Sequence, residues 1–431
     1  MLSVRSERTA ETLVEPPLSA VEGRNPKREL RVLQVFSNLG VGGAETWLMS
    51  LLRYFREQND SLPMDVKFDI LLTGGTKAVF DEEAIALGAR LFYVPFTRRK
   101  ALAFASEFRR ILAREKYDAI HDHQDYIAGI HFSMGVGRLP AIRIAHVHTA
   151  LYHRTRYEND RVLRVAKSSG KRLLASLATH IVGTSKQMVA EYGFDQQRFR
   201  GLELGAAHCG FDTSKYQRDY TETHAQLCQD LGWDTQAKII LFVGRLDSEE
   251  DLHQGSTTEQ KNPGFALDVA RRCIANDEKV RLVMVGSGEA KRREFDLRVK
   301  TWGLGDKIRL LGVRHDVPRL MCGSDLLLFP SSAEGLGMVV VEAQAAGLRT
   351  LASDTTPREC VLIPGLVKFF SLSANLSSWA DEALLELNRQ RPPSKECNTI
   401  VRNSPFAIEN SAEQLINIYT GAGSHRSLAD A

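Results

Sequence analysis

Short apolar runs alternate with amphipathic stretches along most of this chain, and the alternation occurs twice. In the first half the runs of strand length are residues 30–36, 68–72, 90–94, 119–121, 142–146 and 180–183. In the second half they are residues 238–244, 280–285, 308–311, 326–329 and 349–352. Helical patterns separate most of these runs, and such alternation predicts a parallel sheet covered on both faces. The pattern predicts two similar α/β halves.

The limits of these halves follow from the changes in pattern. Residues 1–28 are polar and charged and predict a disordered tail. The first domain is expected at 29–210 and the second at 211–405, because the strand pattern restarts after about residue 215. A last amphipathic helix is expected at 406–420, followed by a tail at 421–431.

Composition excludes several classes of protein. The 431 residues are 43% hydrophobic and 25% charged, which suits globular domains, and the net charge of +3 implies no general attraction to nucleic acid. Six scattered cysteines without a CxxC pattern argue against a disulfide scaffold and fit a reducing compartment. No apolar run approaches the roughly 20 residues that span a bilayer, and a signal peptide's apolar core is missing. We therefore expect a cytoplasmic protein.

Residues 329–347 carry the strongest chemical signal. An apolar strand ends in a Ser-rich loop, Gly335 and Gly337 allow close approach of a ligand, and an apolar helix begins near Met338. Glu342 lies inside this helix and Glu334 lies just before it. An ionised carboxylate in such surroundings needs hydrogen-bond donors, and the free N–H groups at the helix start form an anion site. The alternative is that both glutamates turn outward to solvent.

This combination of strand, glycine loop, helix and two glutamates eight residues apart resembles the Glu-x7-Glu motif of retaining glycosyltransferases of family 4. The resemblance implies that Glu334 contacts hydroxyls of the donor sugar and that Glu342 contacts the ribose. It also implies that the loop and helix start hold the nucleotide diphosphate, at Gly335, Leu336, Gly337 and Met338.

Two basic residues of the second half suit a diphosphate. Arg245 ends the strand at 238–244, and Lys261 precedes the helix expected from Pro263, with Asn262 as its N-cap. A guanidinium and an ammonium at one sheet edge would stabilise the charge of a departing diphosphate. Family 4 enzymes have an Arg and a Lys at these places, although the spacer at 247–260 is longer here. By the same resemblance, the backbone at Val313 and Arg314 would bind the nucleotide base.

The first half opens with a strand, a glycine loop and a helix. A dinucleotide fingerprint would need glycine where Glu45 stands, so the match to that motif is partial. The loop more closely resembles the Gly-Gly-Ala-Glu loop of family 4, which implies that Gly42 and Gly43 meet diphosphate charge.

Histidines mark the ligand edge of the first half. His121 and His123 follow one strand, but Asp122 between them points to the opposite face, which argues against a three-ligand metal site. By resemblance, His123 reaches toward the reacting sugar, and His146 and His148 line the acceptor site. Each of them is alternatively a structural histidine. No Asp-x-Asp follows a strand, so we expect metal independence and no cofactor.

The resemblance implies a GT-B fold, with two Rossmann-like domains whose parallel sheets face each other across a cleft and a C-terminal helix that returns to the first domain. It implies transfer of a sugar from a nucleotide-diphosphate sugar with retention of configuration. Residues 38–47 and 353–357 most resemble bacterial capsule and exopolysaccharide transferases, which extend glycan or lipid-linked acceptors at the inner membrane face.

Two basic patches fit peripheral attachment to an anionic membrane surface, although a solvated helical face explains them equally. One consists of Arg98, Arg99, Lys100, Arg109, Arg110, Arg114 and Lys116, and the other of Arg138, Arg143, Arg154, Arg156, Arg161, Arg164, Lys167, Lys171 and Arg172. Two other classes of protein stay open: an NAD(P)-dependent oxidoreductase, and a catalytically inactive GT-B partner protein.

Overall fold

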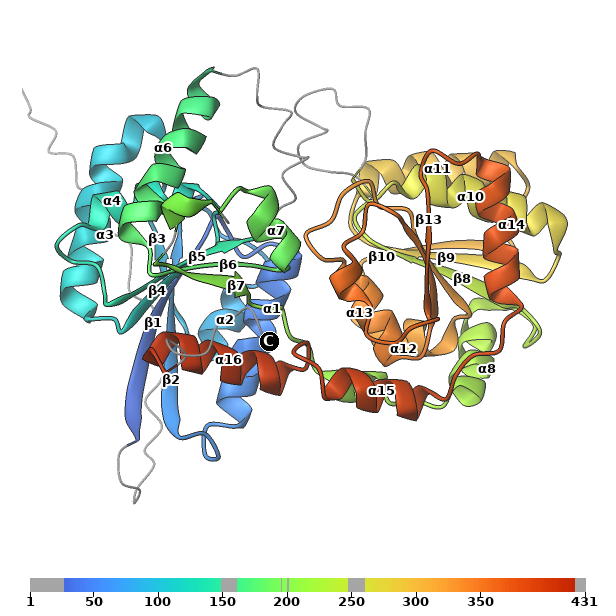
Figure 1. Cartoon of the computed structure of the whole chain (residues 1–431). Coiled ribbons are helices and arrows are strands. Elements are labelled where there is room, and N and C mark those ends of the chain that lie inside the picture. Colours follow the sequence, from blue (N-terminus) through green and yellow to red (C-terminus); the bar gives the residue numbers. More distant parts are fainter. Residues whose placement is uncertain (1–26, 149–160, 195, 200, 247–259, 423–431) are drawn as a thin grey trace, which may run out of the picture.

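The protein consists of two α/β domains that lie side by side, each built on a central parallel sheet with helices on both faces (Figure 1). The computed structural model describes residues 27–148, 161–194, 196–199, 201–246 and 260–422. The predicted tails therefore lie outside the described residues except at their inner ends, where Arg28 already belongs to the first strand.

The first sheet has seven parallel strands in the order β3-β2-β1-β4-β5-β6-β7. Its strands are β1 (Arg28–Phe36), β2 (Met64–Leu72), β3 (Arg90–Tyr93), β4 (Ala119–Asp122), β5 (Ile142–Val147), β6 (His180–Gly183) and β7 (Glu203–Ala206). Its helices are α1 (Gly43–Glu57), α2 (Asp81–Ala86), α3 (Ala101–Glu115), α4 (Ile127–Gly135), α6 (Arg161–Leu177) and α7 (Lys186–Glu191). The six predicted strands are confirmed, and β7 is an additional edge strand.

The second sheet has six parallel strands in the order β10-β9-β8-β11-β12-β13. Its strands are β8 (Lys238–Val243), β9 (Val280–Val285), β10 (Ile308–Gly312), β11 (Leu326–Phe329), β12 (Arg349–Ser353) and β13 (Val367–Phe370). Its helices are α8 (Tyr220–Leu231), α10 (Pro263–Asn276), α11 (Glu289–Thr301), α12 (Val317–Gly323), α13 (Met338–Ala345), α14 (Leu376–Leu387) and α15 (Ser394–Arg402). The interpretation that five strands complete this sheet was wrong, because β13 pairs with β12 at its edge.

In both sheets the strand that comes first in the sequence lies inside the sheet, and later strands are added on both sides of it. In the first domain β1 lies between β2 and β4, and in the second β8 lies between β9 and β11. Doubly wound sheets bind ligands outside the carboxyl ends of the strands at such a switch point. The segments that follow β4 and β11 are therefore the places to look for a site.

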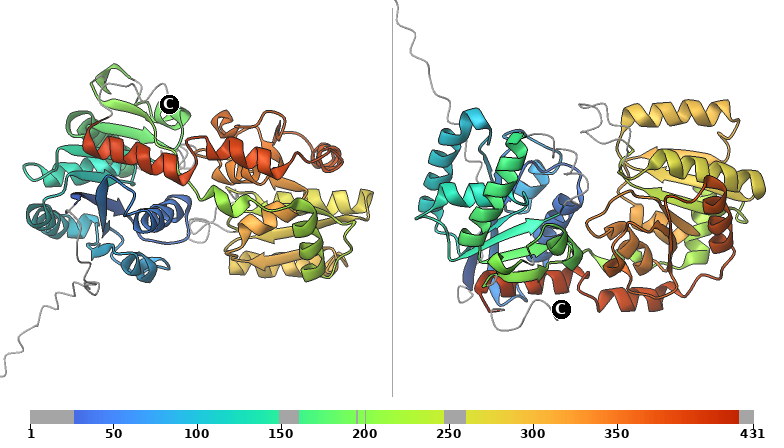
Figure 2. Two further views of the ribbon diagram at one scale, coloured as in Figure 1. Left: turned by 90° about the horizontal axis from the view of Figure 1, so that it is seen from below. Right: turned by 45° about the horizontal axis from the view of Figure 1, so that its top comes forward.

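The last helix, α16 (Ile408–Thr420), packs on the first domain, whereas α15 just before it packs on the second (Figures 1 and 2). Leu415, Ile418 and Tyr419 of α16 are buried in the core of the first domain together with Trp47 and Phe68. The Tyr419 and Phe68 rings lie edge to face at 6.2 Å. The chain thus crosses between the domains twice.

The six cysteines are all buried and unpaired, as the absence of a disulfide scaffold predicted. Among the described residues, no helix combines the length and the apolar character that a membrane crossing requires.

Candidate active site

The loop between β11 and α13 forms the second domain's side of the candidate site. The helix begins at Met338, as predicted, and Gly337 before it has a φ of 90°, a conformation that favours glycine. Gly335 touches the first domain: a Cβ atom there would lie 2.5 Å from the His148 carbonyl oxygen and 2.8 Å from Thr184 Oγ1. The glycines therefore allow this loop to approach the opposite domain closely.

Glu334 is held by Lys261. The Lys261 Nζ lies 2.5 Å from Glu334 Oε1, and the Ser331 hydroxyl donates to the same oxygen. Only 7% of the Glu334 side chain is exposed. The alternative that Glu334 turns outward to solvent was wrong, because a buried carboxylate needs the charge and donors that these two residues supply.

The segment before α10 brings Lys261 to this position. The backbone N–H of Ser332 donates to the Gln260 carbonyl over 2.8 Å, and Gln260 Nε2 donates to the Ala333 carbonyl over 2.9 Å. Asn262 is the N-cap residue of α10, as predicted, but it has a φ of 54° and its side chain makes no cap hydrogen bond. The predicted long spacer lies outside the described residues at 247–259.

Glu342 lies in the second turn of α13 and is half-buried. Burial raises the pKa of its carboxyl from 4.5 to about 7, and a hydrogen bond with the Tyr216 hydroxyl opposes this rise. The carboxyl is therefore close to half-protonated at neutral pH, in contrast to an ordinary surface glutamate.

Arg245 and the glycine loop of the first domain are close to one another. Arg245 is exposed directly after β8, and its charge lowers the pKa of Glu45, which burial raises. Glu45 folds back on Gly42, so that a Cβ atom at Gly42 would lie 2.1 Å from its carboxylate. Gly43 is exposed and begins α1. This loop therefore presents backbone, and a side chain at Gly42 would have to displace the Glu45 carboxylate.

Val313 and Arg314 follow β10 at the edge of the second sheet. Val313 is exposed, and the Arg314 guanidinium forms two hydrogen bonds of 2.7 and 2.8 Å with the Asp316 carboxylate. The Arg314 side chain is thus engaged, which is consistent with a predicted role for the backbone at these two residues.

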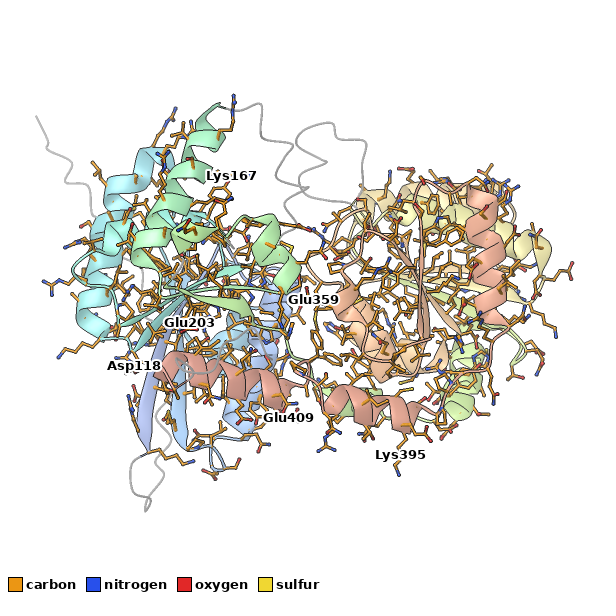
Figure 3. All side chains as sticks on the ribbon, in the orientation of Figure 1. Asp118, Lys167, Glu203, Glu359, Lys395 and Glu409 are labelled. Carbon is orange, nitrogen blue, oxygen red and sulfur yellow. The ribbon has the colours of Figure 1, made fainter. Side chains whose placement is uncertain are left out.

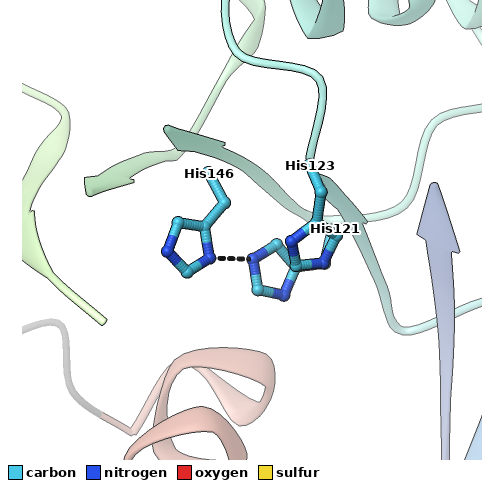
Figure 4. Close-up of side chains that lie close together, drawn as sticks. All are labelled: His121, His123 and His146. Atoms are coloured by element: carbon cyan, nitrogen blue, oxygen red, sulfur yellow. Dashed lines mark hydrogen bonds between the residues drawn. The ribbon is translucent and has the colours of Figure 1, made fainter. Parts of the chain in front are cut away.

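Histidines form the first domain's side of the site. The His121 Nε2 and His146 Nδ1 atoms lie 3.1 Å apart (Figure 4). The His123 Nδ1 and His148 Nε2 atoms lie 2.8 Å apart. Three ring nitrogens lie within 4.8 Å of one another, one each from His121, His123 and His146. This spacing is short enough for a metal ion to bind all three. Asp122 points away, as predicted, and accepts a hydrogen bond of 2.7 Å from His131.

All four rings are neutral at physiological pH. Burial lowers the pKa values of His121, His123 and His146 well below 6.5, and it lowers the pKa of His148 to about 3. Both nitrogens of His123 are engaged, because Nε2 lies 2.8 Å from Gln34 Oε1 and Nδ1 faces His148. In this arrangement His123 offers no free nitrogen to a substrate.

Three residues that the sequence did not single out complete this cluster. Gln34 donates to the Tyr419 hydroxyl over 3.0 Å, and that hydroxyl lies 2.8 Å from His121 Nδ1. The Trp47 ring lies 5.5–6.5 Å from the four histidine rings. A buried glutamine within an apolar strand was a detectable signal for Gln34; Tyr419 had none, because it lies on the last helix.

Direct hydrogen bonds connect the two domains beside the candidate site. The Ser185 hydroxyl donates to the Gly335 carbonyl over 2.8 Å. The Glu359 carboxylate, which lies between the domains in Figure 3, accepts from the backbone N–H groups of Lys186 and Gln187 over 2.8 and 2.9 Å. These bonds bring Glu334 and His148 to the same interface.

The basic patches are only partly available to a partner. Arg143 is half-buried and donates to the carbonyls of Pro140, Ala141 and Leu177, and burial lowers its pKa, so its guanidinium is engaged within the domain. Arg110 is paired with Glu107. The positions of Arg154 and Arg156 lie outside the described residues.

Two family descriptions match this chain. Residues 42–201 match the "Glycosyl transferase 4-like domain" and residues 237–384 match "Glycosyl transferases group 1". The chain belongs to the family 4-like glycosyltransferases of GT-B fold. This assignment excludes the nicotinamide-dependent oxidoreductase.

Its relatives include the "Putative glycosyltransferase EpsF" of Bacillus subtilis, which is 26% identical over 90% of this chain and 96% of that protein. The "Capsular polysaccharide biosynthesis glycosyltransferase CapH" of Staphylococcus aureus is 20% identical over 90% of this chain and 98% of its own length. The solved structure of Anabaena HepE in complex with UDP and glucose has the same fold, with a TM-score of 0.70 at 17% identity over 91% of this chain and all of that one.

Proposed function

We propose that this glycosyltransferase moves a sugar from a nucleotide-diphosphate sugar to a glycan or lipid-linked acceptor, with retention of anomeric configuration, in bacterial exopolysaccharide or capsule assembly. One observation carries the proposal: Glu334, buried and paired with Lys261, lies at the start of α13 beside a loop that touches His148 of the opposite domain. The names of EpsF and CapH support the biological setting, and the HepE complexes with UDP and UDP-glucose support the class of donor.

The donor diphosphate would bind at the junction of three positive or donor groups. Lys261 lies before α10, Arg245 follows β8, and the free N–H groups of residues 335–338 begin α13. Cations and a helix N-terminus stabilise the negative charge that develops on a leaving diphosphate. Because these groups supply positive charge without a metal ion, we propose metal-independent catalysis.

The sugar would lie between Glu334 and the histidines of the first domain. Glu334 would accept hydrogen bonds from sugar hydroxyls, Glu342 from the ribose, and the backbone at Val313 and Arg314 would meet the base. His123 would act from the first domain through the nitrogen of His148 that it binds, and His148, with the buried His146 behind it, would border the acceptor. A front-face attack of the acceptor is the mechanism that we favour, because retention then needs no carboxylate nucleophile.

Calorimetric titration with UDP and GDP, in the presence and absence of a chelator, tests the donor site. We expect one of the two nucleotides to bind equally well in both conditions. Binding that disappears in chelator would contradict metal independence. NMR of the anomeric proton in the transfer product tests retention, and absence of transfer with every donor and acceptor would favour the inactive partner protein.

Peripheral attachment to the inner face of the plasma membrane is a second proposal, for which α3 gives a specific observation. Leu102 is 89% exposed and lies two residues after the basic 3₁₀ turn Arg98–Lys100. An exposed leucine beside three cations suits an anionic bilayer surface. Sedimentation with anionic and neutral vesicles tests this, and Leu102→Ser should weaken binding to the anionic ones. Equal binding to both vesicles would contradict it.

A further inference from the structure

Two chains of hydrogen bonds meet at Gln34 and connect the last helix of the protein to the candidate active site. One chain runs from Gln34 through Tyr419 and His121 to His146, with distances of 3.0, 2.8 and 3.1 Å. The other runs from Gln34 through His123 to His148, with two distances of 2.8 Å. We call this set the histidine network; its members are Gln34, His121, His123, His146, His148 and Tyr419.

The amide of Gln34 gives both chains a direction. A neutral imidazole carries one N–H and one lone pair. If one ring nitrogen carries the proton and donates, the other ring nitrogen must therefore be an acceptor. Gln34 Oε1 only accepts, so His123 must carry its proton on Nε2. His123 Nδ1 is then an acceptor, His148 must donate from Nε2, and the lone pair of His148 is left on Nδ1.

The same reasoning orders the other chain. Gln34 Nε2 donates to the Tyr419 oxygen, so the Tyr419 hydroxyl is free to donate to His121 Nδ1. His121 then carries its proton on Nε2 and donates to His146 Nδ1. His146 Nε2 then keeps a proton. A rotated amide would reverse every step in both chains.

We propose that Gln34 and Tyr419 are positioning residues that order the protons of the histidine network and thereby fix which ring nitrogen His148 offers at the domain interface. This proposal rests on the proposed function, because the order matters for a substrate hydroxyl only if the site transfers sugars. His148 is the member whose backbone touches Gly335 next to Glu334, whereas His121 and His146 are fully buried.

A metal ion is the competing explanation for three clustered histidines. A transition metal needs ligand lone pairs that converge on one point. Here His121 Nε2 and His146 Nδ1 face each other at hydrogen-bond distance, and His123 uses both nitrogens elsewhere. The geometry therefore favours a hydrogen-bonded network, and metal content is a direct test between the two.

Gln34→Glu tests the order of the network most directly, because it keeps the shape of the side chain but removes its N–H donor. A carboxylate accepts from both neighbours, so Tyr419 would donate to it and accept from His121 Nδ1. The tautomers of His121 and His146 should invert, while those of His123 and His148 stay the same. Two-dimensional NMR of protein labelled with ¹⁵N-histidine distinguishes protonated from unprotonated ring nitrogens.

Tyr419→Phe tests the positioning role without adding a charge. Loss of the hydroxyl frees the Gln34 amide to rotate, so we expect mixed tautomers at His123 and a fall of about tenfold in kcat, with donor KM within about twofold. Tyr117→Phe is the matched control, since Tyr117 is also buried in this domain and donates a hydrogen bond, over 2.7 Å to Asp69. It should change neither the tautomers nor kcat.

Unchanged tautomers of His121 and His146 in Gln34→Glu would overturn the proposal. A stoichiometric zinc ion in the purified protein would also overturn it, and so would equal losses of kcat in Tyr419→Phe and Tyr117→Phe. Failure of the proposed function is a separate result: the unchanged protein would then transfer no sugar, while the NMR spectra would still report the order of the network.

Discussion

The two domains present the same kind of sheet edge to the interface but equip it with opposite chemistry. The first domain places neutral rings there, with His123 and His148 tied to one another and to Gln34. The second places charges there, with Lys261 against Glu334 and Arg245 nearby. The fold therefore fixes where a site lies, and the side chains at the strand ends decide what it does.

This difference has a physical reason in the proposed reaction. A diphosphate carries permanent charge and needs cations or a helix N-terminus, which the second domain supplies. An acceptor hydroxyl is neutral, and neutral imidazoles bind and orient it without a strong field. Substitutions of Glu334, Glu342 and Glu359 test this contrast.

Glu334→Gln should have the largest effect. The amide keeps the shape but removes the charge, so we expect transfer to fall about 100- to 1,000-fold, or about 3–4 kcal/mol. Affinity for the free nucleotide diphosphate should stay the same or rise, because Lys261 loses its internal partner. Single-turnover transfer and calorimetry measure the two quantities.

The matched control for Glu334→Gln is Glu382→Gln, which breaks another lysine–glutamate pair of the same domain, with Lys368 at 3.3 Å. It should leave both quantities unchanged. Loss of nucleotide affinity in Glu334→Gln would mean that this carboxylate, and not Lys261, organises the diphosphate site.

Glu342 makes the charged domain sensitive to pH. Its carboxyl has a pKa of about 7 in the folded protein against 4.5 ordinarily, so the native state binds more protons between these pH values. The free energy of unfolding should therefore fall as pH rises from about 4.5 to about 7, by up to about 3 kcal/mol from this group. Glu342→Gln should remove that part of the slope in urea titrations across this range.

An unchanged slope in Glu342→Gln would show that the carboxyl titrates normally. Nucleotide binding gives a second test of the Glu342 pKa. Ribose hydroxyls that donate to the ionised carboxylate would lower its pKa, so binding near pH 7 should release protons. Calorimetry in buffers of different ionisation enthalpy detects this release, which Glu342→Gln should abolish.

Glu359→Gln should have the smallest effect. The substitution replaces one of the two acceptor oxygens that bind the start of α7 across the interface. We expect a loss of about 1 kcal/mol in the closed state, because hydrogen bonds at exposed positions contribute little. The kcat/KM for transfer should fall about threefold to fivefold, and Glu396→Gln on the exposed face of α15 should not change it. A larger fall would give Glu359 a role in chemistry.

Much of this arrangement was predictable from local sequence. The strand, glycine loop and helix around Glu334 are contiguous, and Lys261 stands next to a helix start that Pro263 marks. By contrast, β7 and β13 were missed because Gly205 interrupts the apolar residues of β7 and Lys368 interrupts those of β13. An interrupted run of four residues gives no clear period for either a strand or a helix.

The histidine network lay beyond sequence reasoning for a different reason. Gln34 and Tyr419 are 385 residues apart and meet only because α16 returns to the first domain. The alternation of side chains along β4 correctly predicted that Asp122 points away from the two histidines. The third histidine, however, comes from the neighbouring strand β5. Contacts between distant segments leave no pattern in a single sequence.

The return of α16 also affects how the protein is made. Leu415, Ile418 and Tyr419 are core residues of the first domain, yet they are translated only after all the strands and helices of the second domain. Domains generally fold as units during synthesis, N-terminal first. Here the core around Trp47 and Phe68 lacks these three side chains until the second domain has been translated. The core of the first domain is therefore completed only after the second domain has been synthesised, so a nascent chain halted before α16 leaves this core unfinished.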